Sequence, residues 1–190
     1  PMNLFNPRKD RETELKNEGR IPPGQALTEK FPVLHYGSVP RYDLKTWTFS
    51  IYGEVEETKT FTWDEFQQLP MREIKMDIHC VTRWSKFDTV WKGVHLQDLI
   101  DQKIITLKPA ASFVIEHCEY GFTTNLDMAH FMKPTTLLAV EFDGKPLDAD
   151  HGYPLRVVVG AVRENAKDPD TRYFWKGGKW LRALEFTTKD

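Results

Sequence analysis

The sequence predicts a single α+β domain built on a mixed β-sheet with short interposed helices. Segments in which apolar and polar residues alternate recur along most of the chain, and this alternation is typical of half-buried strands. The expected helices between them are short and irregularly spaced, which argues against repeated βαβ units and a doubly wound sheet. With 190 residues, the chain is long enough to bury one hydrophobic core.

The first half of the chain begins with a polar segment, followed by two strands and a helix. The first thirty residues are charged and lack periodicity, so we expect an extended or partly mobile arm. We place the domain boundary after residue 26, with an arm over 1–26 and one domain over 27–190. Alternation predicts strands over 46–53 and 72–80. Between them, Thr62 and Glu65 form a capping box, which predicts the start of a short helix.

The second half of the chain adds short helices and more strands. An apolar stripe predicts a helix over 93–102, and Asn125 is expected to cap a short helix over 126–132. Residues 119–126 read as a turn, in which Gly121 can take a positive φ. The polar segment 160–174 is expected to be a surface loop. Further strands are predicted over 111–118, 136–142, 154–159 and 180–186.

Composition excludes several classes of protein. Hydrophobic residues make up 40% of the chain and charged residues 28%, which are ordinary values for a globular protein in water. The formal net charge of −2 gives no general attraction for nucleic acid or an anionic membrane, so we expect neither as a partner. No apolar stretch approaches the roughly 20 residues of a membrane-spanning helix, and the N-terminus has no apolar signal core. Two cysteines cannot form a disulfide framework, so reduced thiols and a cytoplasmic location are expected.

Cys80 has two interpretations. Free cysteine is among the most buried residue types, so it can be a structural thiol at the end of a strand. A polar, aromatic-rich loop is expected after Cys80, and Arg83 is close in sequence. This position favours instead a reactive thiolate or a metal ligand, because a nearby cation stabilises the thiolate. A zinc site is not supported, since Cys80 and Cys118 are far apart and no C-x-x-C or H-E-x-x-H motif is present. A hydrolase that pairs Cys80 with a histidine stays open on spacing alone.

A second signal lies near the C-terminus. Between residues 150 and 182 there are seven Lys and Arg against four Asp and Glu, so this segment is basic within an acidic protein. Gly177 and Gly178 stand between Lys176 and Lys179, and glycine backbone N–H groups next to lysines can bind a phosphate. The alternative to a phosphate-binding site is a structural glycine turn whose lysines are exposed to solvent.

Together, the segments "IHCVTRWSKFDTVWKGVHLQDLI" and "HGYPLRVVV…YFWKGGKWLRALEF" resemble the sulfite-oxidase-like molybdopterin-dependent oxidoreductases. The resemblance extends over about residues 27–187. It is greatest to small members, similar to the catalytic subunit of bacterial protein-methionine-sulfoxide reductase but shorter. It implies the sulfite-oxidase fold, a mixed-sheet α+β architecture that binds molybdopterin.

The resemblance also implies roles for individual residues. Cys80 would bind molybdenum, together with the two dithiolene sulfurs of one pyranopterin. Thr82, Arg83 and Tyr120 are candidates for the substrate pocket, although Thr82 stands where the methionine-sulfoxide reductase subunit has an acidic residue. The residues that would contact the pterin and its phosphate are His35, Tyr36, His117, His151, Arg156, Lys176, Gly177, Gly178 and Lys179.

The implied function is that of a molybdenum-dependent oxidoreductase. It would transfer an oxygen atom to or from a small substrate of the sulfite or sulfoxide type and exchange electrons with a partner protein. The cofactor would carry the redox chemistry, and the protein would hold it and tune it. The alternative is a molybdopterin-binding carrier, or an interaction module of a redox complex, that does not catalyse a reaction.

Overall fold

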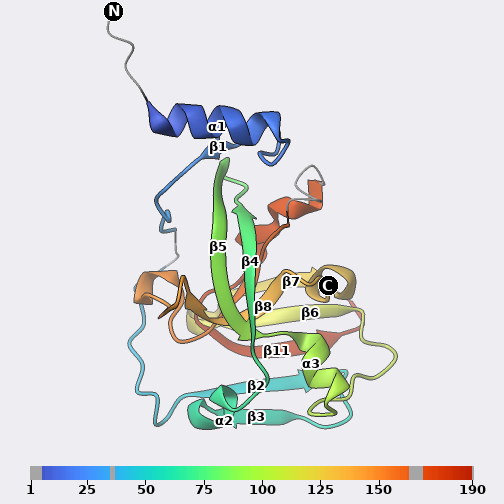
Figure 1. The fold of residues 1–190 in the computed structure, drawn as a ribbon. Helices are drawn as coiled ribbons and strands as arrows, with labels where there is room; N and C mark the ends of the chain where they lie inside the picture. The colour runs from blue at the N-terminus through green and yellow to red at the C-terminus, as the bar shows by residue number, and fades with distance from the viewer. Residues whose placement is uncertain (1–5, 35–36, 163–168, 190) are drawn as a thin grey trace, which may run out of the picture.

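A computed structural model describes residues 6–34, 37–162 and 169–189 and shows two mixed β-sheets in this part of the chain (Figure 1). In the first sheet the strands β1, β5, β8 and β10 lie side by side in that order, with β4 paired to β5 and β9 paired to β8. The first sheet contains β1 (Ala26–Leu27), β4 (Arg72–His79), β5 (Trp84–Val94), β8 (Thr136–Phe142), β9 (Lys145–Pro146) and β10 (Arg156–Val159).

The second sheet has the strand order β3, β2, β11, β6, β7. Its strands are β2 (Thr48–Gly53), β3 (Lys59–Thr62), β6 (Phe113–Cys118), β7 (Thr123–Asp127) and β11 (Leu181–Thr187). Both sheets are mixed, because β1 pairs with β5 and β2 with β11 in parallel, whereas the other pairs are antiparallel. The predicted α+β class with mixed sheets is therefore confirmed.

Apart from α1, which precedes the first strand, the helices are short and lie between strands along the chain, as expected. The α-helices are α1 (Pro7–Asn17), α2 (Trp63–Gln67), α3 (Leu96–Asp101) and α4 (Met128–Phe131). Short 3₁₀ helices are η1 (Glu119–Gly121), η2 (Ala149–His151) and η4 (Pro169–Lys176). In Figure 1, α1 lies across the end of the long β4–β5 hairpin, away from the second sheet.

The main core lies between the sheets. Phe49 of β2, Leu184 of β11 and Val157 of β10 are fully buried in one apolar cluster, together with Phe66 of α2 and Leu99 of α3. Burial of each such side chain stabilises the fold by about 1.5–3 kcal/mol relative to exposure. Close packing also explains Gly53, whose φ is +90° and where an added Cβ would lie 2.2 Å from the carbonyl oxygen of Phe186.

A smaller apolar cluster includes Cys80, the predicted metal ligand. It joins Met76 and Ile78 of β4, Trp91 of β5 and Phe174 of η4 to Cys80 itself. The thiol therefore lies at the edge of a packed core.

Three expectations from the sequence are wrong in detail. The segment after Cys80 is the eleven-residue strand β5 and not a loop. Its inward positions include Ser85 and Thr89, which are buried although they are polar and so hide the apolar alternation. Residues 123–127 form the edge strand β7 and not part of a turn. Helix α4 is capped by Asp127, whose side chain accepts from the His130 N–H at 2.8 Å, and not by Asn125.

The polar N-terminus also differs from the extended arm that we expected. Residues 7–17 form α1, with Pro7 in its first turn and the Asn6 side chain accepting from the Lys9 N–H. Leu15 is buried against Ile21, Leu27 and Phe87, so one apolar position suffices to dock a helix with little periodicity. The division into an arm and one domain stays a prediction.

The segment expected to be a surface loop over 160–174 is partly ordered. Ala161 forms a bridge to Asp77 of β4, and η4 begins at Pro169. Residues 163–168 lie outside the described residues.

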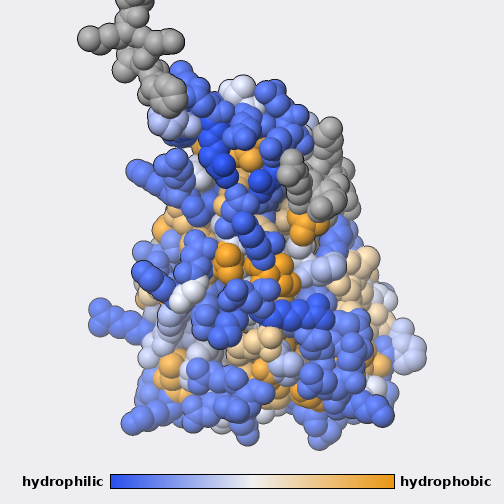
Figure 2. Space-filling model, viewed as in Figure 1, coloured by the Kyte–Doolittle hydropathy of each residue, from blue (hydrophilic) through white to orange (hydrophobic). Residues whose placement is uncertain are grey.

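The surface seen in Figure 2 is mainly hydrophilic, with small and scattered hydrophobic areas. Among the described residues, no helix is both long and apolar enough to span a membrane.

The capping box of α2 is confirmed, and it gives a prediction for stability. The Glu65 N–H donates to the Thr62 side chain at 3.3 Å, and the Glu65 carboxylate accepts from the Thr62 N–H at 2.8 Å. We expect Thr62→Ala to lower the free energy of unfolding by about 1 kcal/mol. For a chain of this size that corresponds to a fall of roughly 2–4 °C in Tm, measured by thermal unfolding. Thr62→Ser keeps the hydroxyl and should unfold near the wild-type temperature; equal losses in both variants would contradict a role for the cap.

Candidate active site

One cavity brings together residues from widely separated parts of the chain. Its volume of about 720 Å³ lies within the range of small-molecule and cofactor sites. Most of its lining is apolar, and the polar groups are few. The lining residues are Phe31, Pro32, Val33, Leu34, Cys80, Thr82, Trp84, Cys118, Glu119, Phe122, His151, Arg156, Phe174, Trp175, Gly177, Gly178, Lys179 and Trp180.

Cys80 reaches the cavity from the turn between β4 and β5. The turn is closed by two backbone hydrogen bonds, from the Cys80 N–H to the Trp84 carbonyl at 2.9 Å and from the Arg83 N–H to the Cys80 carbonyl at 3.0 Å. Arg83 takes a left-handed φ of 70° to make this turn. The Thr82 hydroxyl donates to the Cys80 sulfur at 3.2 Å. This hydrogen bond limits the directions in which the Cys80 sulfur can point.

Arg156 of β10 places a buried positive charge in the same cavity. Its guanidinium donates to the carbonyl oxygens of Val157 at 3.1 Å, His151 at 3.0 Å and Gly177 at 3.4 Å. The guanidinium carbon also lies 4.9 Å from the centre of the Phe174 ring. No ion pair found among the described residues includes Arg156.

Burial lowers the pKa of Arg156 to about 10, and attraction from the nearby Glu116 only partly opposes this. The group therefore stays charged at neutral pH. A buried cation whose hydrogen-bond partners are neutral carbonyls has charge left to neutralise, so this wall of the cavity favours an anionic ligand.

Gly177 and Gly178 line the cavity for a reason other than the one that the sequence suggested. An added Cβ at Gly177 would lie 2.4 Å from the Val157 oxygen, and at Gly178 it would lie 2.5 Å from the Cys118 sulfur. Their N–H groups already donate inside the protein, to the Phe174 carbonyl at 3.1 Å and to the Glu116 carboxyl at 2.6 Å. The glycines therefore allow close packing, and they do not direct two N–H groups at an anion.

Lys179 and His151 add to the polar part of the lining. The Lys179 ammonium donates to the Asp150 carbonyl at 2.7 Å, and burial, followed by repulsion from Arg156, lowers its pKa to about 8. The His151 ring stacks on Phe31 with ring centres 3.8 Å apart, and its Nε2 lies 3.2 Å from the Phe31 carbonyl oxygen. Burial lowers the pKa of His151, so the ring is neutral at neutral pH.

Some predicted site residues do not line the cavity. His117 lies on the opposite face of β6 from Cys118, and its Nε2 is 2.7 Å from the Glu185 carboxylate. Lys176 donates to the Asn125 side chain at 3.1 Å. These two roles stay predictions.

The predicted substrate residues Arg83 and Tyr120 also lie outside the lining, each next to a residue that belongs to it. Both are exposed, and the Tyr120 hydroxyl accepts from Ser38 at 3.3 Å. His35 and Tyr36 lie outside the described residues, so their roles also stay predictions.

The sequence analysis did not select Glu116 or Cys118. Both point inward from β6, where Val114 marks the same buried face. Burial raises the pKa of Glu116 to about 8 and also raises the pKa of the Cys118 thiol. Glu116 stands at an inward position of a predicted strand, and this could have identified it from the sequence, because ionised carboxyls are rarely buried without a partner.

In the described ranges, no three or more His, Cys, Asp or Glu side chains gather as a metal site. A metal at Cys80 would therefore take its other ligands from a cofactor. The site has what such a cofactor needs: one soft sulfur ligand, a buried cation for an anionic group, and an apolar space of suitable size.

One protein is similar to this chain in sequence, and one solved structure is similar to it in fold. The protein-methionine-sulfoxide reductase catalytic subunit MsrP of Campylobacter jejuni is 27% identical over 161 residues, which cover 77% of this chain and 50% of that protein. The crystal structure of the sulfane dehydrogenase SoxCD from Paracoccus pantotrophus has the same fold, with a TM-score of 0.64 and 19% identity over 83% of this chain and 42% of that chain. The present chain thus spans about half the length of these two proteins.

The sequence matches the family described as "Oxidoreductase molybdopterin binding domain" over residues 36–190. The uncharacterized oxidoreductase YuiH of Bacillus subtilis is 42% identical over 173 residues, which cover 90% of this chain and 81% of that protein. These matches confirm the resemblance seen in the sequence: the chain belongs to the family of oxidoreductases with a molybdopterin-binding domain.

Proposed function

We propose that this protein transfers an oxygen atom to or from a small sulfur compound of the sulfite or sulfoxide type, with molybdopterin in the cavity and its metal bound by Cys80. The observation that carries the proposal is that the Cys80 thiol and the Arg156 guanidinium line one cavity, although 76 residues separate them in sequence. A soft metal ligand and an unneutralised buried cation are the two protein groups that a metal-bearing anionic cofactor requires.

When bound, the cofactor supplies a redox-active metal that exchanges two electrons and an oxygen atom with the substrate. Reduction of a sulfoxide consumes two electrons and two protons and releases one water, and oxidation of sulfite runs in the opposite sense. The protein supplies binding, orientation and electrostatics for this chemistry.

At the metal end, the turn fixes the direction of the Cys80 side chain. The two backbone hydrogen bonds of the turn hold the residue at the end of β4, and the Thr82 hydroxyl is directed at its sulfur. Thr82 therefore helps to fix the direction in which the sulfur points.

At the anionic end, Arg156 and Lys179 provide the positive charge. Arg156 is 3% exposed, so its field acts through an environment of low dielectric and is little screened by salt. The stacked His151 and Phe31 rings give this part of the cavity a flat, rigid wall, which suits a planar ring system.

Glu116 contributes by holding a proton. Its Oε2 accepts from the Gly178 N–H at 2.6 Å, whereas Oε1 has no hydrogen-bond partner among the described residues. A neutral carboxyl is the less costly form in such a place, and with the proton on Oε1 the glycine loop keeps its hydrogen bond. Because Glu116 is then uncharged, the cavity keeps its positive potential for an anion.

The substrate side of the cavity is apolar. Val33, Leu34, Phe122 and Trp175 are exposed and line the cavity, which favours a substrate or partner with an apolar contact surface. Thr82 lines the cavity, and Arg83 and Tyr120 each stand next to a lining residue in the sequence; we propose that these three supply the polar groups that contact an oxo substrate. An electron-transfer partner and a cytoplasmic location remain our expectations.

Removal of the proposed metal ligand tests this function. We expect Cys80→Ala to lose molybdenum, measured by elemental analysis of the holoprotein, or to lose at least about 100-fold in turnover with a sulfoxide or sulfite and an artificial electron carrier. Cys118→Ala removes the other cavity thiol, whose sulfur packs under Gly178, and should retain molybdenum. Full metal content together with full turnover in Cys80→Ala would refute the proposed ligation.

Replacement of the buried cation separates cofactor binding from folding. We expect Arg156→Met to weaken retention of the pterin at least about 10-fold, because 1.4 kcal/mol or more of charge attraction is lost. The apo-protein should still fold, with a loss of about 1–3 kcal/mol in the free energy of unfolding, because three carbonyl oxygens lose their donors while a buried charge is removed. Pterin content is measured by fluorescence after extraction, and stability by urea unfolding.

Lys108→Met is the matched control for charge, since Lys108 is exposed and lies outside the cavity. It should retain cofactor like the wild type. Unchanged pterin content in Arg156→Met would show that the anionic group binds elsewhere.

The proton on Glu116 predicts how the stability of the apo-protein depends on pH. The folded-state pKa of about 8 lies above the ordinary glutamate value of about 4.5, so the folded state binds this proton more tightly than the unfolded state. The contribution of this proton to the free energy of unfolding is fully present below about pH 4.5 and is lost as the pH rises to about 8. The loss is on the order of a few kcal/mol. Glu116→Gln should remove this dependence, measured by urea unfolding from pH 4.5 to 8.5.

Glu73→Gln changes an exposed carboxyl of β4 to an amide and should keep the wild-type profile. Parallel pH profiles for Glu116→Gln and wild type would mean that Glu116 is ionised in the folded protein.

A further inference from the structure

The N-terminal segment, which precedes the residues matched by the family, closes one side of the turn that carries Cys80. A turn in which the Gln25 N–H donates to the Pro22 carbonyl at 3.1 Å leads into β1. The Ala26 N–H then donates to the Arg83 carbonyl at 3.0 Å, and the Thr28 N–H to the Ser85 carbonyl at 2.9 Å. The chain is thus fixed in register along the first residues of β5.

Gln25 spans this turn with its side-chain amide. Its Nε2 donates to the Cys80 carbonyl at 2.9 Å, and its Oε1 accepts from the Ser85 hydroxyl at 3.1 Å. Gln25 is 6% exposed and Ser85 is fully buried, so both bonds are protected from water. The Cys80 carbonyl can only accept, so it requires the Nε2 half of the amide, and this fixes the orientation of the amide and turns Oε1 towards Ser85.

The chain of hydrogen bonds continues to the residue before the thiol. The Ser85 hydroxyl lies 2.8 Å from Nδ1 of His79, which is fully buried. Since the single hydroxyl proton of Ser85 is donated to Gln25, Nδ1 of His79 must be the donor in this contact. Gln25, Ser85 and His79 therefore form one ordered chain that passes behind Cys80.

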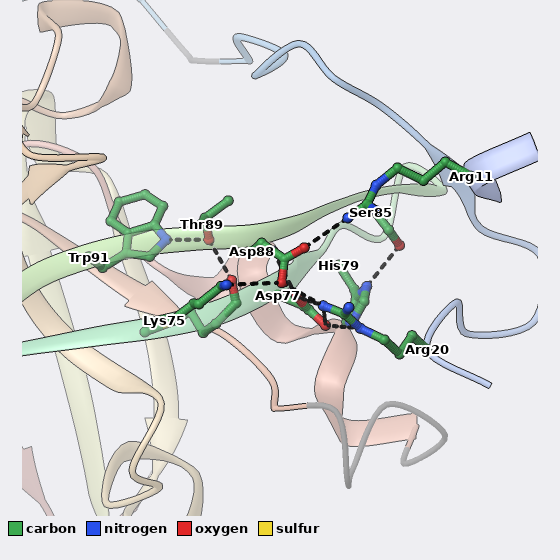
Figure 3. Close-up of polar contacts among 10 residues, drawn as sticks. Arg11, Arg20, Lys75, Asp77, His79, Ser85, Asp88, Thr89 and Trp91 are labelled. Carbon is green, nitrogen blue, oxygen red and sulfur yellow. Dashed lines mark hydrogen bonds and ion pairs between the residues drawn. The ribbon is translucent and has the colours of Figure 1, made fainter. Parts of the chain in front are cut away.

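Ion pairs anchor the same N-terminal segment to both strands of the hairpin. Figure 3 shows Arg20 between Asp77 of β4 and Asp88 of β5, with N–O distances of 2.9 and 3.0 Å. Arg11 of α1 adds a second contact to Asp88 at 2.9 Å. Asp77 is nearly buried and also accepts from the Asp88 N–H at 3.0 Å, so this anchor belongs to the packed structure.

We infer that Gln25 is a positioning residue for Cys80: through its amide, the N-terminal segment sets the backbone from which the thiol reaches the cavity. The Cys80 carbonyl accepts two hydrogen bonds, one from within the turn and one from Gln25. The rest of the turn has little support of its own, since Val81, Thr82 and Arg83 are exposed. The consequence of the Gln25–Cys80 hydrogen bond for a bound metal rests on the proposed function. The effect of Gln25 on the position of the Cys80 backbone does not depend on that function.

The test compares Gln25→Leu with wild type in the full-length protein. In the apo-protein, the rate at which iodoacetamide alkylates Cys80 is followed by mass spectrometry of the Cys80 peptide. In the holoprotein, molybdenum content and the Mo(V) electron paramagnetic resonance spectrum are measured. We expect the alkylation rate to change several-fold, the spectrum to shift, and metal retention to fall by about 10–100-fold, as for other residues that orient a metal ligand.

Two further variants make the result decisive. Gln25→Glu keeps the size of the side chain but replaces the donor to the Cys80 carbonyl by an acceptor, so it should reproduce the effect if Gln25→Leu does not fold. Thr62→Ala lowers stability far from the hairpin turn and should leave both the alkylation rate and the spectrum as in wild type. If the Gln25 variants lose stability but keep the wild-type alkylation rate and spectrum, the residue is merely structural and the inference fails.

Failure of the proposed function would be distinguishable. If Cys80→Ala kept its molybdenum and turnover, ligation by Cys80 would be refuted. The alkylation rates of apo-protein would still report whether Gln25 sets the position of the Cys80 thiol.

Discussion

The burial of one guanidinium, that of Arg156, is the constraint on which the cavity depends. Three carbonyl oxygens and two aromatic rings surround the group, and they come from β10, η2, the glycine loop, β5 and η4. A cation in such a place costs several kcal/mol unless its donors are satisfied, so these segments must all be in position at once. The loop that follows η4 can approach closely enough only because residues 177 and 178 are glycines. The cation therefore organises the wall of the cavity as well as its charge.

The carboxyl of Glu116 completes this arrangement from the opposite side of the loop. It accepts from the Gly178 N–H, while the guanidinium donates to the Gly177 carbonyl. The loop is thus held by an acceptor on one sheet and a donor on the other, and in this way the two sheets are connected by polar contacts as well as by the apolar core. An ionised carboxyl would neutralise part of the positive charge in the cavity. A protonated one keeps the hydrogen bond without that loss.

Much of the fold could be predicted from the sequence, because alternation and the capping box are local signals. The strands over 72–79 and 136–142 and the cap at Thr62 are of this kind. Strand β5 was not found, because its buried positions include Ser85 and Thr89, whose hydroxyls are satisfied only by groups distant in sequence. Helix α1 was not predicted for the same reason: its stabilising contacts, made by Leu15 and by an ion pair to the hairpin, are with residues distant in sequence.

The candidate site shows the same division. Cys80, His151, Arg156 and Lys179 could be named because they lie in recognisable motifs, and the fold brings them to one cavity. The role of Glu116 can be inferred only when two facts are known: which face of β6 is buried, and that the glycine loop packs against that face. The glycines were found for the wrong reason, since the need for close packing against β6 and β10 is not visible in a one-dimensional pattern.

The two ends of the cavity are held in different ways, and this has a consequence for dynamics. The cationic end lies within the packed layers, where Arg156 and Glu116 are almost fully buried. The thiol end is a short turn in which residues 81–83 are exposed. The hydrogen bonds that hold it come from a segment anchored by a few ion pairs and by the small apolar cluster around Leu15. Local opening requires less free energy where few buried apolar contacts are broken. The thiol turn should therefore open more readily than the cationic wall, so a cofactor would meet a preformed anion site and a more adaptable metal ligand.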